Sequence, residues 1–273
     1  MDKGFLYTGL EGKAVIVTGG SQGIGAAIVR KFAELGSIVT ILDLNDDKGG
    51  EVVDSLNGHD IRFIHADLMA PDQCGRAVSE AALYGKQTTA MDGAYDRIDV
   101  LVNCAGRNDN VSVGADRDKI MRSLELNVGQ YAHMISLCWP YLISSKGNVI
   151  NIGSKTGDVG QKGSWAYSAA KGGVNALTYA CARDGAPLDI RVNCVNPSEV
   201  PTELYHRWAS DTFGGDALKA MAEIGAKIPL YGRMTSPEEI ANAVVFLASN
   251  VLSSHTTGQI LRPNGGHPQL NER

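Results

Sequence analysis

The sequence lacks the features that mark several large classes of protein. It has only five cysteines in 273 residues, an odd number with no Cys-x-x-Cys pair, which argues against a disulfide framework and a zinc site. No apolar run approaches the roughly 20 residues that a membrane-spanning helix needs. The first residues show no basic segment followed by an apolar core, so we expect no signal peptide. These absences favour a cytoplasmic protein.

Positive charge is also scarce. The chain has 25 Lys and Arg against 30 Asp and Glu, a net charge of -5, and its pI is about 5.7. Nucleic-acid-binding surfaces need clustered basic residues, so we expect no such partner. The six histidines show no spacing typical of metal ligands, and we expect no metal, which disfavours a metal-dependent dehydrogenase.

What is present is an alternation of short apolar runs and longer helical patterns. Short runs rich in Val and Ile are typical of strands buried on both faces, and their alternation with helices predicts a doubly wound parallel sheet. We therefore expect an α/β protein with one Rossmann-type domain over residues 1–273, its seven strands covered by helices on both faces. The expected strands are Ala14–Thr18, Ile38–Leu42, Ile61–Ala66, Val100–Asn103, Asn148–Ile152, Arg191–Val195 and Gln259–Leu261. The expected helices include Gly25–Leu35, Asp116–Leu137, Trp165–Arg183 and Pro237–Ser249.

Two stretches interrupt this alternation. The polar stretch Tyr84–Arg97 precedes a strand, and we interpret it as a lengthened surface connection. The long stretch Ser198–Leu230 mixes aromatic residues with glycine and follows a strand. Ligands of such sheets bind beyond the carboxyl ends of the strands, so 198–230 is expected to form a lid or substrate-binding region.

The stretch TGGSQGIG, Thr18–Gly25, follows the first expected strand. A strand, a glycine-rich turn and a helix start leave backbone N–H groups free at the positive end of the helix, which suits a pyrophosphate. The spacing is Gly-x-x-x-Gly-x-Gly rather than the commoner Gly-x-Gly-x-x-Gly. A tight turn with close packing of helix on strand is the alternative explanation, because such turns need glycine in any case.

Asp43, directly after the second expected strand, strengthens the nucleotide interpretation. A carboxylate there can accept both ribose hydroxyls of NAD and would repel the extra phosphate of NADP. Asp67 is placed to meet the adenine in the same way. Either aspartate could instead cap a helix or a turn.

The stretch YSAAK places Tyr167 and Lys171 one helical turn apart on the same side. A phenol is a poor base at neutral pH, but a nearby ammonium favours the phenolate, so the pair could transfer protons. On its own the pattern fits any helix face. Its context is Ser154 at the end of the run NVINIGS, Asn127 in the run SLELNVG, and the stretch NCAG over Asn103–Gly106.

In this order along residues 10–266, these motifs resemble the short-chain dehydrogenase/reductase family. The resemblance implies that Tyr167 is the catalytic acid/base, that Lys171 holds the nicotinamide ribose, that Ser154 binds the reacting oxygen, and that Asn127 supports the proton relay. It also implies a set of residues around the dinucleotide: Gly19, Ser21, Gly23, Ile24 and Gly25 at the pyrophosphate, Asp67 and Leu68 beside adenine, and Asn103, Gly106 and Pro197 along the cleft. Members are usually tetramers, so a homotetramer is expected.

Three positions depart from the family pattern. Cys104 replaces the second asparagine of NNAG, Ser198 replaces the glycine of VNPG, and Asn264 replaces the aspartate of the C-terminal DGG. None of these changes removes a proton-transfer group. Ser198 lies where the family contacts nicotinamide.

The substrate pocket of the family corresponds here to polar and aromatic positions. Charged groups in a pocket suit a polyol better than a hydrocarbon. The stretches GSKTGDVGQ and NPSEVPTELYHRW resemble the branch that contains L-fucose and other aldose dehydrogenases, which implies oxidation of an anomeric hydroxyl with NAD. A hydroxysteroid or another secondary alcohol is the alternative substrate, and a non-catalytic NAD sensor is the alternative from another class. The expected pocket residues are Ser154, Lys155, Gln161, Glu199, Tyr205, His206 and Trp208.

Overall fold

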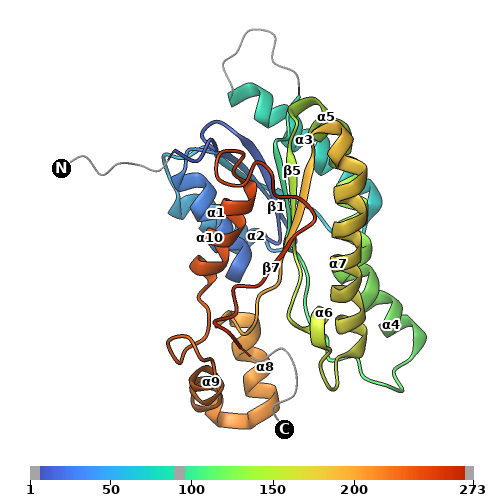
Figure 1. Ribbon diagram of the computed structural model, residues 1–273, viewed down its shortest axis with the longest axis vertical. Coiled ribbons are helices and arrows are strands. Elements are labelled where there is room, and N and C mark those ends of the chain that lie inside the picture. The colour runs from blue at the N-terminus through green and yellow to red at the C-terminus, as the bar shows by residue number, and fades with distance from the viewer. Residues whose placement is uncertain (1–6, 89–95, 268–273) are drawn as a thin grey trace, which may run out of the picture.

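A computed structural model describes residues 7–88 and 96–267, and its centre is one seven-stranded parallel sheet (Figure 1). The strands lie in the order β3-β2-β1-β4-β5-β6-β7, which reverses direction between β1 and β4. Ligands of doubly wound sheets bind at such a switch point. The seven expected strands are confirmed, with ends that shift by no more than one residue: β1 (Ala14–Thr18), β2 (Ile38–Asp43), β3 (Ile61–His65), β4 (Val100–Asn103), β5 (Asn148–Ile152), β6 (Arg191–Val195) and β7 (Ile260–Leu261).

Helices cover both faces of the sheet, as expected for this fold (Figure 1). One face carries α1 (Gly23–Glu34), α2 (Asp46–Ser55) and α10 (Pro237–Ala248). The other carries α3 (Pro71–Thr88), α4 (Arg117–Leu124), α5 (Gln130–Ser145) and α7 (Trp165–Gly185). Three further helices follow the carboxyl ends of β5 and β6: α6 (Thr156–Val159), which packs on α7, and α8 (Glu203–Phe213) and α9 (Ala217–Ala226), which pack on each other.

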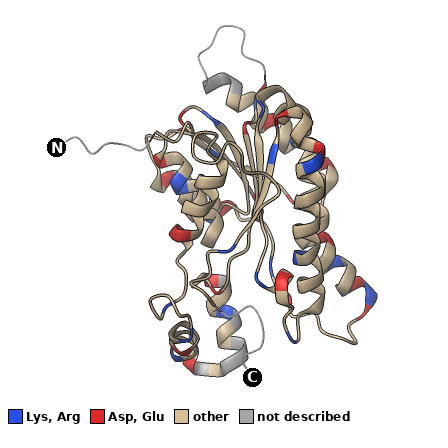
Figure 2. Cartoon of the chain, viewed as in Figure 1, with Lys and Arg blue, Asp and Glu red and all other residues tan. Residues whose placement is uncertain are grey.

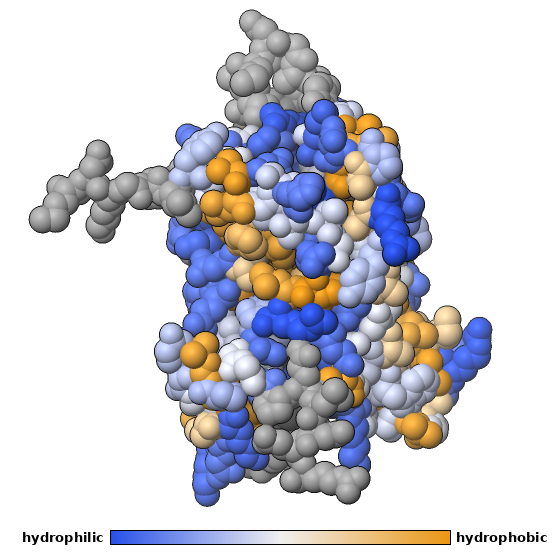
Figure 3. Space-filling view, in the orientation of Figure 1, coloured by the Kyte–Doolittle hydropathy of each residue, from blue (hydrophilic) through white to orange (hydrophobic). Residues whose placement is uncertain are grey.

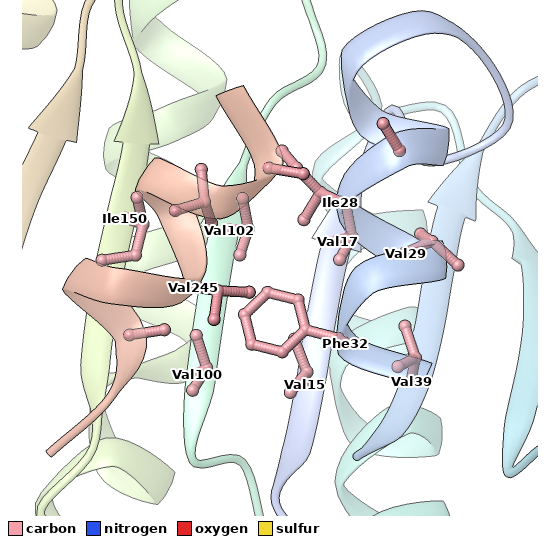
Figure 4. Packing of buried hydrophobic residues seen from close by; sticks show 14 of the residues in the cluster. Val15, Val17, Ile28, Val29, Phe32, Val39, Val100, Val102, Ile150 and Val245 are labelled. Carbon is pink, nitrogen blue, oxygen red and sulfur yellow. The ribbon is translucent and has the colours of Figure 1, made fainter. Parts of the chain in front are cut away.

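Alternation of side chains along the strands places a separate apolar core on each face of the sheet. In β1, Val15 and Val17 point to the core beneath α1 and α10, while Ile16 points to the core beneath α3 and α5. Figure 4 shows Phe32 of α1 lying between Val15 and Val245 of α10, and Phe32 is fully buried. Charged residues lie mainly on the helices around the sheet (Figure 2). This packing holds the carboxyl edge of the strands in a fixed arrangement.

A ladder of buried polar groups anchors α7 on the sheet. The Asn103 Nδ2 donates to Asn151 Oδ1 at 3.0 Å, and the Asn151 Nδ2 donates to Thr178 Oγ1 at 3.0 Å. Thr178 in turn donates to the carbonyl oxygen of Val174 at 2.8 Å. Because buried polar groups are costly unless they are paired, this ladder fixes the position of α7 and of the residues that it carries.

The single helix expected over Asp116–Leu137 is wrong in detail. The chain instead forms α4, a π-helical segment over Glu125–Gly129, and α5, which runs on to Ser145. Two side-chain amides explain the wider turn: Asn127 Nδ2 donates to the carbonyl oxygen of Ser123 at 2.9 Å, and Gln130 Nε2 donates to that of Leu126 at 2.8 Å. In an α-helix the backbone N–H groups of the same two residues would bind those carbonyls.

The two interrupting stretches are more regular than a loop interpretation suggests. Helix α3 extends to Thr88, so the first part of the expected connection 84–97 is helical, and residues 89–95 lie outside the described part of the chain. The stretch 198–230 contains α8 and α9, which pack on each other around Ala209 and Met221. In the described residues, no helix has the length and apolar character required to cross a bilayer.

Candidate active site

The glycine-rich turn joins β1 to α1 at the carboxyl edge of the sheet. Gly19 has a φ of +68°, and a Cβ on it would lie 2.7 Å from the Cα of Ala105. A Cβ on Gly25 would overlap the carbonyl oxygen of Gly19. These two glycines are therefore required by the packing of the turn itself, which is the alternative that the sequence left open.

The same turn also fits an anion. The first turn of α1 carries no acidic residue, and its N-cap residue, Gln22, makes no side-chain capping bond. The free N–H groups of Gly23 and Ile24 begin this helix of 12 residues, so its positive end is open to a bound phosphate. The described residues in this turn thus fit the pyrophosphate of a dinucleotide, while serving the packing of the fold as well.

Asp43 ends β2 directly beside this turn. Its Oδ2 accepts hydrogen bonds from the backbone N–H of Ser21 at 3.1 Å and from the Ser21 hydroxyl, and its Oδ1 accepts one from the N–H of Leu44 at 2.7 Å. Asp43 is not the N-cap of α2, because Asn45 has that role. The carboxylate is therefore fixed between the glycine-rich turn and the next strand, where a ribose bound beside the turn would meet it.

Asp67 and Leu68 follow β3, with different surroundings. Asp67 Oδ1 accepts a hydrogen bond from the N–H of Met69 at 2.9 Å, so it supports a turn, as the capping alternative describes. The side chain of Leu68 is buried in the core beneath α3 and α5. The backbone of Asp67 and Leu68 and the half-buried Asp67 carboxylate lie at the carboxyl edge of the sheet. The Leu68 side chain points away from this edge into the core.

The residues of the NCAG stretch differ in their surroundings: some are buried in the fold and one is exposed. The Asn103 side chain is fully buried in the ladder under α7, so it lies beneath the cleft instead of lining it. The N–H groups of Cys104 and Ala105 both donate to Thr18 Oγ1, at 2.9 and 3.2 Å, which ties this stretch to the glycine-rich turn. Gly106 is exposed, and a Cβ on it would lie 2.7 Å from Asn127 Oδ1 and 3.7 Å from Lys171 Nζ.

Tyr167 and Ser154 lie next to each other at the carboxyl edge of the sheet. Tyr167 lies in the first turn of α7, Ser154 follows β5, and their side chains are hydrogen-bonded. Desolvation by the surrounding protein raises the pKa of the Tyr167 phenol to about 12, although the hydrogen bond with Ser154 acts to lower it. The phenol is consequently protonated at neutral pH in the protein alone, which suits it to donate a proton.

Lys171 is buried one turn further along α7. Its Nζ donates to the carbonyl oxygen of Ile152 at 2.8 Å and to the Tyr131 hydroxyl at 3.1 Å, and it lies 5.8 Å from the centroid of the Tyr167 ring. Burial lowers the pKa of Lys171 to about 8, so its ammonium remains charged at neutral pH. The ammonium and the phenol are thus neighbours, but burial opposes the formation of phenolate that the sequence pattern alone suggests.

Asn127 is held rigidly in the π-helical segment. Its Oδ1 accepts from the N–H of Arg107 at 3.0 Å, and its Nδ2 donates to the carbonyl oxygens of Arg107 at 3.0 Å and Ser123 at 2.9 Å. All of these bonds are to backbone, so the side chain joins the stretch after β4 to the segment before α5. It lies beside Gly106 and Lys171.

The expected pocket contains an ion pair next to Ser154. Lys155 pairs with Glu199, which also accepts a hydrogen bond from the Ser198 hydroxyl and lies 3.7 Å from His267 Nε2. Burial acts to raise the pKa of the Glu199 carboxyl, but Lys155 and Ser198 together hold it below its usual value. Pro197 contributes its carbonyl oxygen, which accepts from the N–H of Lys155 at 2.9 Å. A half-buried, mutually neutralised pair of charges therefore lies next to Ser154.

The other expected pocket residues surround this pair less closely. Tyr205 of α8 packs on α9, and burial together with the charge of Glu199 raises the pKa of its phenol. Gln161 follows α6, and its N–H donates to Ser168 Oγ at 3.0 Å. His206 is half-buried in α8. The side chain of Trp208 lies outside the described part of the structure.

Three residues of the site were not predicted from the sequence. Tyr131 contacts Lys171, and Thr202 lies against Gly23. Asp158, in α6, accepts hydrogen bonds from four donor atoms. Tyr131 stands four residues after Asn127, a spacing that could have indicated a shared face. Thr202 is the N-cap of α8, accepting from the N–H of Tyr205, and a Thr before Glu-Leu is a recognisable capping signal. The sequence around Asp158 carries no comparable signal.

Comparison with known proteins agrees with this arrangement. The profile of the short chain dehydrogenase family matches residues 13–213. Bovine (Bos taurus) L-fucose dehydrogenase is 37% identical over 258 residues, covering 93% of this chain and 89% of the relative. The 3-oxoacyl-[acyl-carrier-protein] reductase of Chlamydia pneumoniae is 35% identical, covering 94% of this chain and 97% of the relative.

A solved structure supports the same assignment. The ligand-free aldohexose dehydrogenase of Thermoplasma acidophilum superposes with a TM-score of 0.85 at 30% identity, covering 98% of each chain. The match of the family profile spans the glycine-rich turn, Asn127, Ser154, Tyr167 and Lys171, which this structure assembles at one edge of the sheet. The chain therefore belongs to the short-chain dehydrogenase family, whose members bind NAD(P) and act as oxidoreductases on alcohol or ketone groups.

Proposed function

We propose that this enzyme oxidises the anomeric hydroxyl of an aldose such as L-fucose, with NAD as the hydride acceptor. The observation that carries the proposal is the Lys155–Glu199 ion pair directly after Ser154. A half-buried pair of opposite charges offers both hydrogen-bond donors and acceptors to a polyhydroxylated ring, whereas it would oppose an apolar substrate. The names of the bovine L-fucose and the archaeal aldohexose relatives support the same substrate class.

The proposed chemistry divides between the cofactor and the chain. NAD accepts the hydride from the anomeric carbon when it is bound. Ser154 binds the reacting oxygen, and Tyr167 takes the hydroxyl proton as the lactone carbonyl forms. Lys171 holds the nicotinamide ribose and stabilises the phenolate by its charge, and Asn127 keeps the neighbouring stretch in place. The Ser154–Tyr167 hydrogen bond supports these roles, because both groups must reach one oxygen atom.

The residues proposed to bind the dinucleotide surround the glycine-rich turn. Gly19, Ser21, Gly23, Ile24 and Gly25 are proposed at the pyrophosphate, and Asp43 at the adenosine ribose. The Asp43 carboxylate beside Ser21 supports a preference for NAD over NADP, since it would repel an additional phosphate. Asp67, Gly106 and Pro197 are proposed along the remainder of the cleft.

A second function has its own support. The chlamydial relative of similar identity is named as a reductase of 3-oxoacyl groups, and the protonated Tyr167 phenol suits the reduction of a ketone. The same residues would then deliver a proton to a developing alkoxide. A hydroxysteroid or another secondary alcohol would use the same chemistry. The charged pair beside Ser154 favours the sugar over both apolar alternatives.

We also propose that the whole chain acts as one unit, assembles as a homotetramer and works in the cytoplasm. An apolar band crosses the face of Figure 3 at the level of β7. Beside it a shallow groove is lined by small residues of α7, among them Ala176 and Ala180, and by Tyr179, whose side chain is exposed. Such a surface suits contact with a second copy of the chain. The five cysteines are all free, which suits a reducing compartment.

The test is the formation of NADH or NADPH by purified enzyme with NAD or NADP, against L-fucose, other aldoses, polyols and hydroxysteroids. Reduction of 3-oxoacyl thioesters is followed as the consumption of NADH or NADPH. The Tyr167→Phe variant is the matched blank, and its binding of NADH is measured separately by fluorescence. We expect aldose oxidation with NAD that the variant loses while it retains NADH binding. Turnover restricted to steroids or thioesters would overturn the sugar assignment and keep the mechanism. Activity retained by Tyr167→Phe would overturn the mechanism.

A further inference from the structure

A second tyrosine lies against the catalytic lysine. Tyr131, in the first turn of α5, is fully buried, and its hydroxyl oxygen lies 3.1 Å from Lys171 Nζ. The ammonium also lies over its ring, 4.7 Å from the centroid. The Tyr131 hydroxyl donates its own hydrogen to the carbonyl oxygen of Ile152 at 3.2 Å, the same oxygen that accepts from Lys171 at 2.8 Å. Lysine, phenol and carbonyl therefore form a closed triangle.

This triangle fixes the direction of the ammonium. A lysine ammonium has three N–H donors and rotates freely unless they are engaged. Two of the three are directed to Ile152 and Tyr131, which leaves the third for a ligand in the cleft. Without Tyr131 only the bond to Ile152 would remain among the described contacts, and the head group could turn about it.

The π-helical segment brings Tyr131 to this position. It places the wider turn between Asn127 and the start of α5, and its last N–H bond runs from Gln130 to the carbonyl oxygen of Glu125. Both Asn127 and Tyr131 then approach Lys171: the former beside Gly106, the latter in direct contact. Turns of this kind are uncommon and recur at functional sites.

The charge of Lys171 is otherwise supported weakly. No carboxylate in the described residues forms an ion pair with it, and the titratable groups that face it are Tyr131 from α5, Tyr167 from α7, Cys104 after β4 and Cys194 of β6. Dipoles and aromatic faces therefore offset the cost of burying the ammonium. Burial lowers the pKa of Lys171 to about 8, so the loss of one acceptor would bring its neutral form close to physiological pH.

We propose that Tyr131 is a positioning residue, which holds the Lys171 ammonium in place and directs its remaining N–H into the cofactor cleft. This inference rests on the role proposed above for Lys171. Tyr131 is not a second proton carrier: its hydroxyl is sealed from solvent, and its only hydrogen is committed to a backbone carbonyl. Burial also raises its pKa well above the usual range, which is consistent with a permanently neutral phenol.

The test is the Tyr131→Phe variant, which removes the hydroxyl and keeps the ring. Its matched control is Tyr141→Phe on the same helix, a half-buried tyrosine away from Lys171. We expect kcat to fall about tenfold in Tyr131→Phe, as for the loss of one hydrogen bond to a charged group, with little change in the KM for the alcohol. The rising limb of kcat/KM for oxidation should move to higher pH, because a less firmly held ammonium favours the Tyr167 phenolate less.

NADH affinity gives a readout that does not need a substrate. We expect Tyr131→Phe to bind NADH several-fold more weakly than Tyr141→Phe in a fluorescence titration, with melting temperatures recorded for both variants. A merely structural role would lower the melting temperature and leave the pH limb and the NADH affinity at control values, which would overturn the proposal. If the enzyme oxidises no aldose, the proposed substrate fails, and the NADH titration still decides the role of Tyr131.

Discussion

The carboxylate of Asp43 and the backbone N–H of Ser21 are 3.1 Å apart, which joins the end of β2 to the glycine-rich turn. The Ser21 hydroxyl donates to the same carboxylate oxygen. Asp43 therefore has two tasks if it also binds a ribose: it shapes the turn before the dinucleotide arrives, and it discriminates between NAD and NADP. Substitutions that separate charge from shape can distinguish the two tasks.

Replacing Asp43 by Asn should weaken NAD binding by about 10- to 100-fold, because a charge-assisted hydrogen bond to the ribose is lost. Binding of NADP should weaken less or improve, since the repulsion of its phosphate disappears. Titration of both cofactors by calorimetry measures the ratio. Ser21→Ala is the control: it removes the hydroxyl bond, loosens the turn and should affect both cofactors alike. An unchanged NAD/NADP ratio in Asp43→Asn would reject Asp43 as the ribose ligand.

The pKa of Tyr167 predicts an alkaline preference for oxidation. Alcohol oxidation needs the phenolate, and desolvation raises the pKa of Tyr167 to about 12, so at neutral pH this form is rare. We expect kcat/KM for oxidation to rise between about pH 6 and pH 8, by up to roughly tenfold per pH unit, while kcat/KM for the reverse reduction does not rise. Above the pKa of Lys171, about 8, the rise should flatten as the ammonium loses its charge.

Rates in both directions at constant ionic strength check this expectation. Binding of NAD and NADH is measured at each pH, so that changes in affinity are separated from the chemical step. An oxidation rate that is flat or falls across this range would contradict the assignment of Tyr167 as the base.

Glu199 should contribute more to the binding of sugars than to the binding of simpler alcohols. Replacing it by Gln leaves Lys155 half-buried without its carboxylate, and removes an acceptor from the pocket. We expect the KM for an aldose to rise about tenfold or more, with a smaller change for a small secondary alcohol. Glu34→Gln, on the exposed end of α1, is the control for the loss of one surface charge. Equal effects on both substrates would argue against a sugar-binding role.

Much of the fold could be predicted, because its strands are short, apolar and separated by helices of clear period. The first strand shows the reason. Its two faces are both buried, with Val15 and Val17 in one core and Ile16 in the other, so its sequence is a continuous run of Val and Ile. The π-helical segment could not be predicted, because it depends on the side-chain amides of Asn127 and Gln130 binding carbonyls that the backbone would otherwise bind.

The candidate site was predictable where spacing on one element sets the geometry, as for Tyr167 and Lys171 on α7. It was less predictable where burial decides the outcome. Asn103 lies in the right stretch, yet its side chain serves the buried ladder, and Leu68 faces the core. The contact of Tyr131 with Lys171 joins residues of α5 and α7, and only the three-dimensional packing brings them together.

Replacing Asp158 of α6 should destabilise the fold. Its Oδ1 accepts from Arg262 Nη2 at 2.9 Å and Asn175 Nδ2 at 3.2 Å, and its Oδ2 accepts from Arg262 Nε at 3.0 Å and Asn196 Nδ2 at 3.0 Å. Asp158→Asn replaces the carboxylate by an amide, so the exposed Arg262 loses its charged partner and one of the buried donors Asn175 and Asn196 loses its acceptor. We expect a loss of about 3 kcal/mol in the free energy of unfolding, or roughly 6–10 °C in melting temperature. Because α6 follows Ser154 directly, kcat should fall as well.

The pH dependence of this loss follows from the sign of the Asp158 shift. Burial acts to raise the pKa of the carboxyl, but the hydrogen bonds from Arg262 and Asn196 bring it below its ordinary value of 3.8. A lowered pKa in the folded protein stabilises it above that ordinary value, and the benefit disappears as pH falls through the folded pKa. The difference in melting temperature between the native enzyme and Asp158→Asn should therefore be full at pH 7 and shrink in acid. Asp189→Asn, which breaks an exposed ion pair with Lys146, should change the melting temperature little at any pH. If Asp158→Asn lowers the melting temperature no more than Asp189→Asn does, α6 is held by its backbone hydrogen bonds alone.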